Sequence, residues 1–344
     1  MAETETADSP LLAELSTRDK PWDRHKADSQ EIALMYFRGG EQRRCERMLD
    51  CAHQLQFALL PQDDDQVSIR LKQARFCRQR HCPICSWRKT MMWRSRVLKA
   101  MHPRFDRGKT RSRYILEDYP KARFLHVVLT VQNPPMAQLR ETCQLMSKAW
   151  GKMSRRAIFP AIGWVRSLEV TREKSKRAYP HPHYHCLLMV PPSYFKGGKY
   201  LKKSAWVDMW QQALGVDYKP SVYVSAVYSK KSGETNGIES GVLEALAYNL
   251  KSDDLKLDVD WLTELTAQMT QLKSVAVGGI FKDYINEDEP DNFIRVDDDD
   301  DGEDLSQYPQ WWFGWREMTQ HYHRNAIVEP DSNNHSDDDI MEGE

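Results

Sequence analysis

The chain has 344 residues, of which 40% are hydrophobic and 29% charged, with a net charge of −1. This length can bury a full hydrophobic core and accommodate two or three structural units. No apolar run approaches the ~20 residues of a membrane span, and the first nine residues lack the regions of a signal peptide. We therefore expect a cytoplasmic protein with no membrane partner. Seven unevenly spaced cysteines argue against a secreted disulfide framework.

Charge is distributed unevenly along the chain. Residues 66–121 contain 16 Lys/Arg and 3 Asp/Glu, a net charge of +13, whereas residues 283–304 contain 12 Asp/Glu and one Arg, a net charge of −11. The basic block favours a polyanion such as nucleic acid, although an ordinary solvated surface is the alternative. The acidic block predicts disorder.

The chain divides into five predicted regions. They are a flexible N-terminal lead-in (1–44), a cysteine-bearing basic segment (45–121), a regularly patterned domain (122–255), a helical and aromatic region with an acidic linker (256–328), and an acidic tail (329–344). The last two regions carry the weakest secondary-structure signals, apart from a possible helix at 261–272. The aromatic cluster at 311–315 is either a plug packed into the core or a platform on which bases stack.

The patterned domain predicts alternating strands and helices. We expect strands at 124–131, 164–171, 183–190 and 221–228, and helices at 136–156, 201–214 and 239–250. The order β-α-β-β-α-β-α indicates an α+β fold. Its first six elements match the split βαβ antiparallel sheet of ferredoxin-like and RRM-like domains.

Two histidines open the third strand. His183 and His185 are two residues apart, so they project from the same face of a strand whose following residues are apolar. Paired imidazoles can bind a divalent metal ion. Glu169 is the lone acid of the preceding strand and is the candidate third ligand, because a carboxylate on a sheet face needs a partner. His181 has the same parity, but its flanking prolines place it in the turn. Ordinary surface histidines are the alternative.

A short predicted helix carries a tyrosine between charged residues. Glu244, Tyr248 and Lys251 are spaced by four and three, which places them on one helical face. A phenol with a pKa of ~10 is a poor nucleophile, but a nearby ammonium and a metal-polarised phosphate would make its attack feasible. Glu244 could then act as a base for water. An ordinary solvated helix face has the same pattern.

The cysteine segment predicts a structural zinc site. Cys77, Cys82 and Cys85 offer three thiolates, and a tetrahedral site needs a fourth ligand. Cys51 is the best candidate, followed by His81, His53 and Cys45. Buried free cysteines are the alternative for Cys82 and Cys85. Basic residues that lie between and after the cysteines suggest contacts with DNA phosphates: Arg78, Arg80, Arg88, Lys89 and Arg94.

In combination, these motifs resemble those of the plasmid rolling-circle replication initiators of the HUH endonuclease superfamily, in particular the group first described on small plasmids of Gram-positive bacteria. The resemblance covers roughly residues 45–255. It rests on FCRQRHCPICSWRK (76–89), FLHVVLTVQN (124–133), SLEVT (167–171) with HPHYHCLL (181–188), and EALAYNLK (244–251). Four motifs in this order are far more specific than any one of them.

The resemblance implies roles for individual residues. His183 and His185 match the histidine pair, and Glu169 matches the acidic co-ligand of a Mg²⁺ or Mn²⁺ ion. Tyr248 matches the nucleophile that cleaves one strand at the origin, keeps the 5′ phosphate covalently and frees a 3′ hydroxyl. Glu244 matches the acid that directs a water-dependent second cleavage. Lys251 matches the basic residue of the helix.

One position departs from the family pattern. Many relatives have a lysine just before the tyrosine, where this chain has Ala247. This difference bears on how the phosphate or the metal is oriented and not on which residue attacks.

The resemblance also implies partners. These are plasmid origin DNA in single-stranded or hairpin form, and a host helicase, DNA polymerase and single-strand binding protein. The chain has no Walker-type Gly-rich loop, so the helicase must be a separate protein. Two rival functions remain: a non-catalytic zinc-containing DNA-binding regulator, and a metal-dependent hydrolase without a covalent step.

Overall fold

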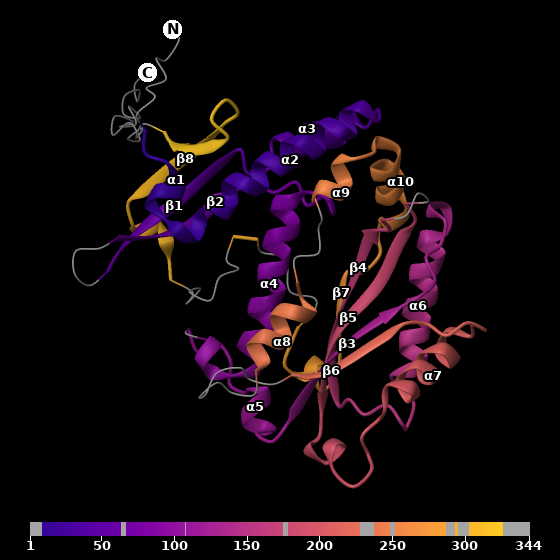
Figure 1. Cartoon of the computed structure of the whole chain (residues 1–344). Coiled ribbons are helices and arrows are strands. Elements are labelled where there is room, and N and C mark those ends of the chain that lie inside the picture. Colours follow the sequence, from indigo (N-terminus) through magenta and orange to yellow (C-terminus); the bar gives the residue numbers. More distant parts are fainter. Residues whose placement is uncertain are drawn as a thin grey trace, which may run out of the picture.

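Two antiparallel β-sheets and the helices packed on them form the described part of the chain, so the predicted α+β class is confirmed (Figure 1). The computed structural model describes residues 9–62, 67–106, 108–174, 178–227, 237–247, 252–286, 293–294 and 303–325. Among these residues, no helix combines the length and the hydropathy needed to cross a bilayer.

The larger sheet has five strands in the order β6-β3-β5-β4-β7. The strands are β3 (Arg123–Thr130), β4 (Gly163–Arg172), β5 (Pro180–Val190), β6 (Val222–Val227) and β7 (Val275–Gly279). The first four follow the predicted β-α-β-β-α-β order, with each strand antiparallel to its neighbours. β7 is an additional edge strand that we did not predict, and it pairs with β4.

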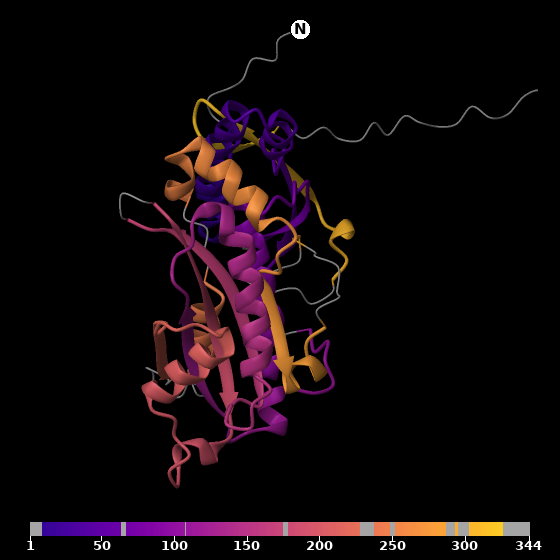
Figure 2. The same cartoon turned by 90° about the vertical axis from the view of Figure 1, so that its right-hand side faces the viewer.

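Helices cover both faces of this sheet, which Figure 2 shows from the side. α6 (Leu139–Met153) and α7 (Lys203–Leu214) cover one face, and α8 (Ile238–Ala245) with α4 (Pro83–Met101) behind it covers the other. Because both faces are covered, the central strand β5 is buried along residues 186–190.

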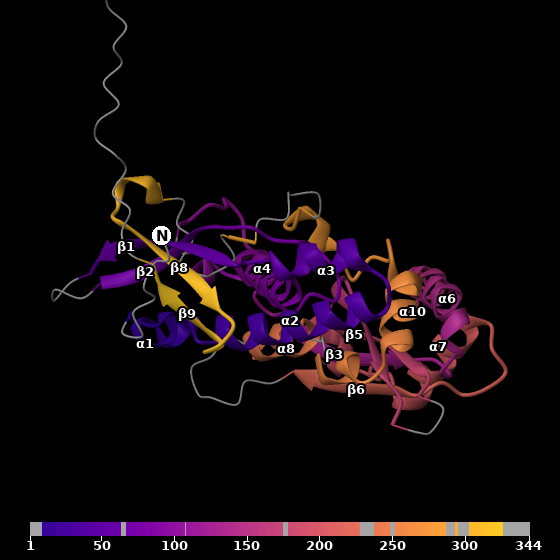
Figure 3. The ribbon, with the colours of Figure 1, turned by 90° about the horizontal axis from the view of Figure 1, so that it is seen from above.

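The smaller sheet joins segments from both ends of the described chain (Figure 3). Its order is β2-β1-β8-β9, with β1 (Gln54–Pro61), β2 (Val67–Ala74), β8 (Gln310–Arg316) and β9 (His321–Arg324). The aromatic segment that we assigned to a helical and aromatic region is therefore mainly a β-hairpin paired with β1.

The alternation of side chains along β8 explains the aromatic cluster. Phe313 and Trp315 are buried, and the ring of Phe313 meets Phe57 edge-on at 5.7 Å. Trp312 points to the opposite face and is 37% exposed. The core-packing interpretation therefore holds for the inward-facing rings.

The N-terminal segment is folded, which corrects the expectation of a flexible lead-in over residues 1–44 for its described part. It forms α1 (Leu12–Leu15), α2 (Pro21–Arg38) and α3 (Gln42–Leu49). Trp22 is fully buried and contacts Trp87 and Tyr322 edge-on. The buried side of α2 includes Lys26 and Ser29, and its exposed side includes Leu34 and Phe37. Its packing partners lie far along the chain, so the sequence of this segment alone looks weakly patterned.

The remaining elements connect the two sheets. α5 (Ile115–Asp118) lies near the end of the basic segment, and α9 (Ser252–Lys256) and α10 (Val259–Met269) precede β7. α10 corresponds to the helix predicted at 261–272. Most of the acidic block 283–304, and all of the tail 329–344, lie outside the described residues.

Candidate active site and metal centres

Glu169, His183 and His185 meet on one face of the larger sheet. Glu169 is the register partner of His183, and His185 projects from the same face two residues further along β5. The Nε2 atoms of His183 and His185 lie 3.0 and 2.9 Å from the same oxygen, Glu169 Oε2. All three ligand atoms lie within 4.8 Å of one another, so this group could hold one metal ion.

Hydrogen bonding determines which nitrogen of His183 is available. Its Nδ1 lies 3.0 Å from the carbonyl oxygen of His181, which can only accept, so Nδ1 carries a proton. In the neutral ring the lone pair is then on Nε2, which faces the Glu169 carboxylate. Between a lone pair and a carboxylate oxygen only a cation is stable, either a proton or a metal ion.

The Glu169 carboxylate is available as an oxygen ligand. Its side chain is buried, and burial alone would raise its pKa. When the facing Nε2 atoms carry protons, hydrogen bonds from His183 and His185 outweigh burial and lower the pKa of Glu169 from 4.5 to about 2. A metal ion in place of those protons would favour the carboxylate in the same direction. The group is therefore ionised at neutral pH.

His181 does not join this group. It lies within β5 rather than in the turn where we expected it, and its Nδ1 is 2.6 Å from Asn133 Oδ1. Parity along the strand therefore does not by itself make it a ligand.

His126 on β3 is a site residue that the sequence analysis missed. It is buried, its Nε2 lies 3.4 Å from His185 Nδ1, and the two rings stack 13° from parallel. A hydrogen bond from His185 Nδ1 to this nitrogen would leave His185 Nε2 for a metal, as outer partners of metal-binding histidines do. Burial lowers the pKa of His126, which favours the neutral ring that this contact needs. A lone histidine in the apolar run 124–131 becomes informative only once β3 is paired with β5.

Glu244 reaches this group from α8. Its Oε1 lies 3.1 Å from His126 Nδ1, an atom that is buried and makes no hydrogen bond within the described residues. The carboxylate is the group placed to satisfy that nitrogen. Glu169, His185, His126 and Glu244 therefore form one continuous row.

Two features fix α8 against the sheet. Gly241 allows a close approach, since a Cβ there would lie 3.0 Å from side-chain atoms of Leu187 and Val227. The hydroxyl of Ser167 on β4 donates to the carbonyl oxygen of Ala245 at 2.7 Å.

The helix is shorter than predicted. We expected it to span 239–250, but it ends at Ala245, where Arg94 donates to the carbonyl oxygens of Leu246 and Leu243. Tyr248 and Lys251 lie outside the described residues. Their predicted common face with Glu244 therefore stays a prediction.

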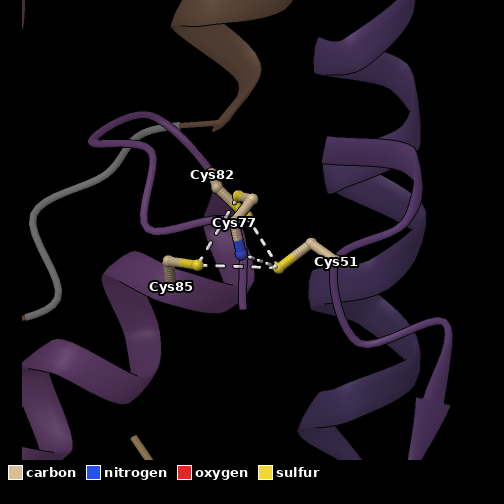
Figure 4. Close-up of side chains that lie close together, drawn as sticks. All are labelled: Cys51, Cys77, Cys82 and Cys85. Carbon is tan, nitrogen blue, oxygen red and sulfur yellow. Dashed lines mark hydrogen bonds between the residues drawn. The ribbon is translucent and has the colours of Figure 1, made fainter. Parts of the chain in front are cut away.

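Four cysteines form a second candidate metal centre (Figure 4). Cys51, Cys77, Cys82 and Cys85 are buried, with their sulfur atoms within 4.8 Å of one another. The closest sulfur pairs are 3.5 to 3.7 Å apart. A tetrahedron with Zn–S bonds of about 2.3 Å has edges of about 3.8 Å, so the spacing suits such an ion. The rival fourth ligands His81, His53 and Cys45 are not in this group.

The surroundings of the cysteine cluster suit negatively charged sulfur. The backbone N–H groups of Cys77 and Arg78 donate to Cys51 Sγ and Cys85 Sγ at 3.4 and 3.2 Å. The fully buried Lys26 donates to the carbonyl oxygens of Leu49 and Cys51. Burial lowers the pKa of this ammonium, whereas the neighbouring Cys51 raises it. A buried cation beside four thiolates would offset part of their charge.

Arg88 is not available to DNA, which corrects our expectation. It is 2% exposed, and its guanidinium donates to the carbonyl oxygens of Phe293 and Ile294. It also lies over the ring of Trp22. Its charge is therefore used to tie α4 to other segments.

The other predicted DNA contacts fall into two groups: two arginines bind backbone carbonyl oxygens, and two residues line a cavity. Arg94 caps α8, and Arg80 donates to the carbonyl oxygen of Leu272. Arg78 is exposed and Lys89 is half-buried, and both line a cavity beside Glu169.

The fold and these two centres define an α+β protein with a histidine–carboxylate group on an antiparallel sheet and a four-cysteine cluster beside it. A family model described as "Replication protein" matches residues 68–323. "Protein rep" of Streptococcus pneumoniae serotype 2 (strain D39 / NCTC 7466) is 30% identical over 316 residues, which cover 89% of this chain and 92% of the relative. "Protein rep" of Lentilactobacillus hilgardii is 29% identical over 294 residues, 82% of this chain and 88% of the relative. No solved structure is significantly similar to the chain.

The chain belongs to this replication-protein family. The resemblance of its motifs to plasmid Rep proteins is thereby confirmed, and with it a role as a plasmid replication initiator.

The contact between His126 and His185 predicts an effect on metal affinity. His126→Phe keeps a ring against His185 but removes its nitrogen contacts, so we expect Mn²⁺ affinity to fall by roughly tenfold, at the lower end of outer-partner effects. Electron paramagnetic resonance titration of the full chain measures this affinity. The control His181→Phe alters a neighbouring imidazole outside the group and should bind Mn²⁺ normally. Equal affinities for both variants would show that His126 does not orient His185.

Proposed function

We propose that this chain is a site-specific single-strand DNA endonuclease and strand transferase that starts and ends rolling-circle replication of a plasmid. The observation that supports this most directly is the convergence of two imidazole nitrogens on one buried Glu169 oxygen, with the tautomer of His183 fixed by a backbone carbonyl. Because that carbonyl holds the Nδ1 proton of His183, the Nε2 lone pair of the neutral ring and the ionised Glu169 carboxylate are both available to a divalent cation.

Glu169, His183 and His185 would hold a Mg²⁺ or Mn²⁺ ion. Both ions prefer six ligands and keep several waters, so three protein ligands leave positions open for phosphate oxygens. When bound, the ion would polarise the scissile phosphate as a Lewis acid. The protein keeps Glu169 ionised, and the contact of His183 Nδ1 with the His181 carbonyl oxygen directs the Nε2 lone pair of the neutral ring toward that carboxylate.

Tyr248 would supply the nucleophile. Its phenolic O–H would lose its proton to solvent, and the oxygen would bond to phosphorus while the bond from phosphorus to the 3′ oxygen breaks. The leaving oxygen would take up a proton from solvent to become the 3′ hydroxyl. The 5′ phosphate stays on the tyrosine, so the later transfer to another 3′ hydroxyl needs no ATP. Lys251 would lower the cost of forming the phenolate.

Glu244 would direct the second cleavage by acting as a base toward water. Its position at the end of α8, 3.1 Å from His126, keeps it beside the histidine group. The row from Glu169 through His185 and His126 to Glu244 would therefore hold the metal ligands and the water-activating acid in one arrangement.

The cysteine cluster would hold a structural Zn²⁺ through Cys51, Cys77, Cys82 and Cys85. The sulfur spacing and the N–H groups directed at two of the sulfurs support this assignment. The basic segment that contains it would contact the single-stranded or hairpin origin DNA, with Arg78 and Lys89 as the remaining candidates. The partners would be the host helicase, DNA polymerase and single-strand binding protein, in the cytoplasm.

The nucleophile assignment is tested by covalent capture. With origin single-stranded DNA and Mn²⁺, wild type should form a protein–DNA adduct that survives denaturation, and Tyr248→Phe should form none. Tyr223 is the informative control, since this exposed residue has its ring 6.2 Å from that of His126. Tyr223→Phe should form the adduct normally. If Tyr248→Phe formed the adduct and Tyr223→Phe did not, the nucleophile would be Tyr223. An adduct in both single variants would reject the assignment to Tyr248.

The role of Glu244 predicts a separation of two steps. Glu244→Ala should nick the origin at the wild-type rate but lose second-strand cleavage by roughly 10²- to 10⁴-fold, the usual contribution of a general base. Timed assays on a substrate that contains both cleavage sites resolve the two products. Glu239→Ala changes another exposed acid of α8 and should leave both steps intact. Normal second cleavage by Glu244→Ala would contradict the proposed base.

Zinc content tests the cysteine cluster. Wild type should contain one zinc ion per chain, and Cys51→Ser should lose it because a structural site needs all four ligands. Cys45→Ser removes a buried thiol outside the cluster and should keep the metal. Elemental analysis of the purified proteins measures both. Zinc retained by Cys51→Ser at full stoichiometry would exclude Cys51 as a ligand.

A further inference from the structure

A cavity of about 500 Å³ lies beside the histidine–carboxylate group. Its walls come from the cysteine-bearing loop before α4 (residues 75–82) with the start of α4, from β4 and the turn before β7, from the residues after α8, and from α9 and α10. These elements can be followed in Figure 1. Its volume falls within the range of small-ligand sites in proteins.

The cavity exists because β4 is longer than its edge partner. β7 pairs with β4 only as far as Ser167, and one further bond joins the N–H of Leu168 to the carbonyl oxygen of Ser274. The chain turns away at Gln271, which has a positive φ of 63°. Within the described part of the chain, the end of β4 that carries Glu169 therefore has no strand beside it on this side.

Hydrogen bonds hold the opposite walls together. Arg80 in the cysteine-bearing loop donates to the carbonyl oxygen of Leu272. His81 Nδ1 lies 2.8 Å from the hydroxyl of Thr266 on α10. The cysteine cluster thus fixes one wall of the cavity, and Cys85 itself lines it.

The chemistry of the walls suits a nucleobase with its phosphate. Trp93, Trp261 and Phe293 contribute aromatic rings, each with an arginine guanidinium over it. Positive charge comes from Arg78, which is the arginine over Phe293, and from Lys89. The indole N–H of Trp93 is buried and has no acceptor within the described residues. Bases carry carbonyl and ring-nitrogen acceptors that such a donor can bind.

The cavity is continuous with the proposed reaction site. Glu169 belongs both to the histidine group and to the cavity wall. Ala247, which immediately precedes Tyr248 in the chain, also lines it. A DNA strand with its scissile phosphate at the histidine group would therefore place a neighbouring nucleotide at the cavity.

We propose that this cavity binds one unstacked nucleobase adjacent to the scissile phosphate and so sets the base preference of the nick site at that position. The inference rests on the proposed function, because it takes single-stranded origin DNA as the ligand. A base in a single strand or a hairpin loop costs little to unstack, which favours this mode of recognition. The cysteine cluster then has a defined role, which is to hold one wall of the base site in place.

Binding rather than cleavage tests the cavity, so that failure of the nucleophile assignment does not affect the result. In a Tyr248→Phe background without added Mg²⁺ or Mn²⁺, fluorescence anisotropy measures the affinity for origin oligonucleotides in which each nucleotide near the nick site is made abasic in turn. One position should weaken binding by roughly tenfold, as expected when a single stacked base is lost. If no abasic position loses more affinity than its neighbours do, the proposal is overturned.

Filling the cavity gives the second arm. Thr90→Phe on α4 and Ser274→Phe on the opposite wall each add a ring to the cavity. Both variants should bind the intact oligonucleotide with the same reduced affinity that the parent shows for the oligonucleotide abasic at the sensitive position. Removal of that base should then cause no further loss of affinity in either variant. Gln144→Phe adds the same ring on the exposed side of α6 and should behave as the parent does. Zinc content and Mn²⁺ affinity verify folding, and folded filled variants that still discriminate the abasic position would reject the site.

Discussion

One buried carboxylate oxygen organises the functional face of this protein. Glu169 Oε2 is shared by the Nε2 atoms of two histidines, and the contact is stable only with a cation between them. Burial of a carboxylate is costly, and the fold compensates by placing both imidazoles on the next strand in the correct register. The sheet, its register and the helix that covers it can all be understood as the support for this contact.

Further side chains hold the two histidines and Glu169 in place. His126 lies against His185 from a third strand, and Glu244 reaches His126 from α8. α8 in turn is held by the hydroxyl of Ser167 and by Arg94 of α4. A rigid chain of this kind positions reacting groups more accurately than a loop does, which is what the proposed transfer of a phosphodiester to a tyrosine would require.

The cysteine cluster supports the same site from the other side. It joins the turn after α3 to the loop that leads into α4, so that one metal ion would fix the start of the helix that caps α8. Backbone N–H groups donate to two of the sulfur atoms, and the ammonium of Lys26 binds the backbone carbonyl oxygen of Cys51. Basic residues that resemble a DNA-binding surface in sequence are divided by the fold between structural tasks and the cavity. Arg88 and Arg94 bind backbone carbonyls, whereas Arg78 and Lys89 remain beside the cavity.

Much of the larger sheet could be predicted because its signals are local. Period-two alternation placed His183 and His185 on one face, and the lone acid in the preceding strand identified Glu169 as their partner. Cysteine spacing similarly identified three members of the cluster, and Cys51 was chosen among four possible fourth residues. The family itself could be recognised from the order of short motifs, since each motif is a continuous stretch of chain.

What the sequence determined by itself was therefore the chemistry: a histidine pair, a carboxylate, a tyrosine-bearing segment and a set of thiols. Only the tertiary structure decided which of these groups meet and what surrounds them. It added His126, buried the lead-in helix α2, ended α8 at Ala245, paired the aromatic segment with β1, and opened a cavity where β4 outruns β7. The physical reason is that these features arise from contacts between segments far apart in the chain, whose energies depend on register and packing and leave no periodic signal in either segment alone.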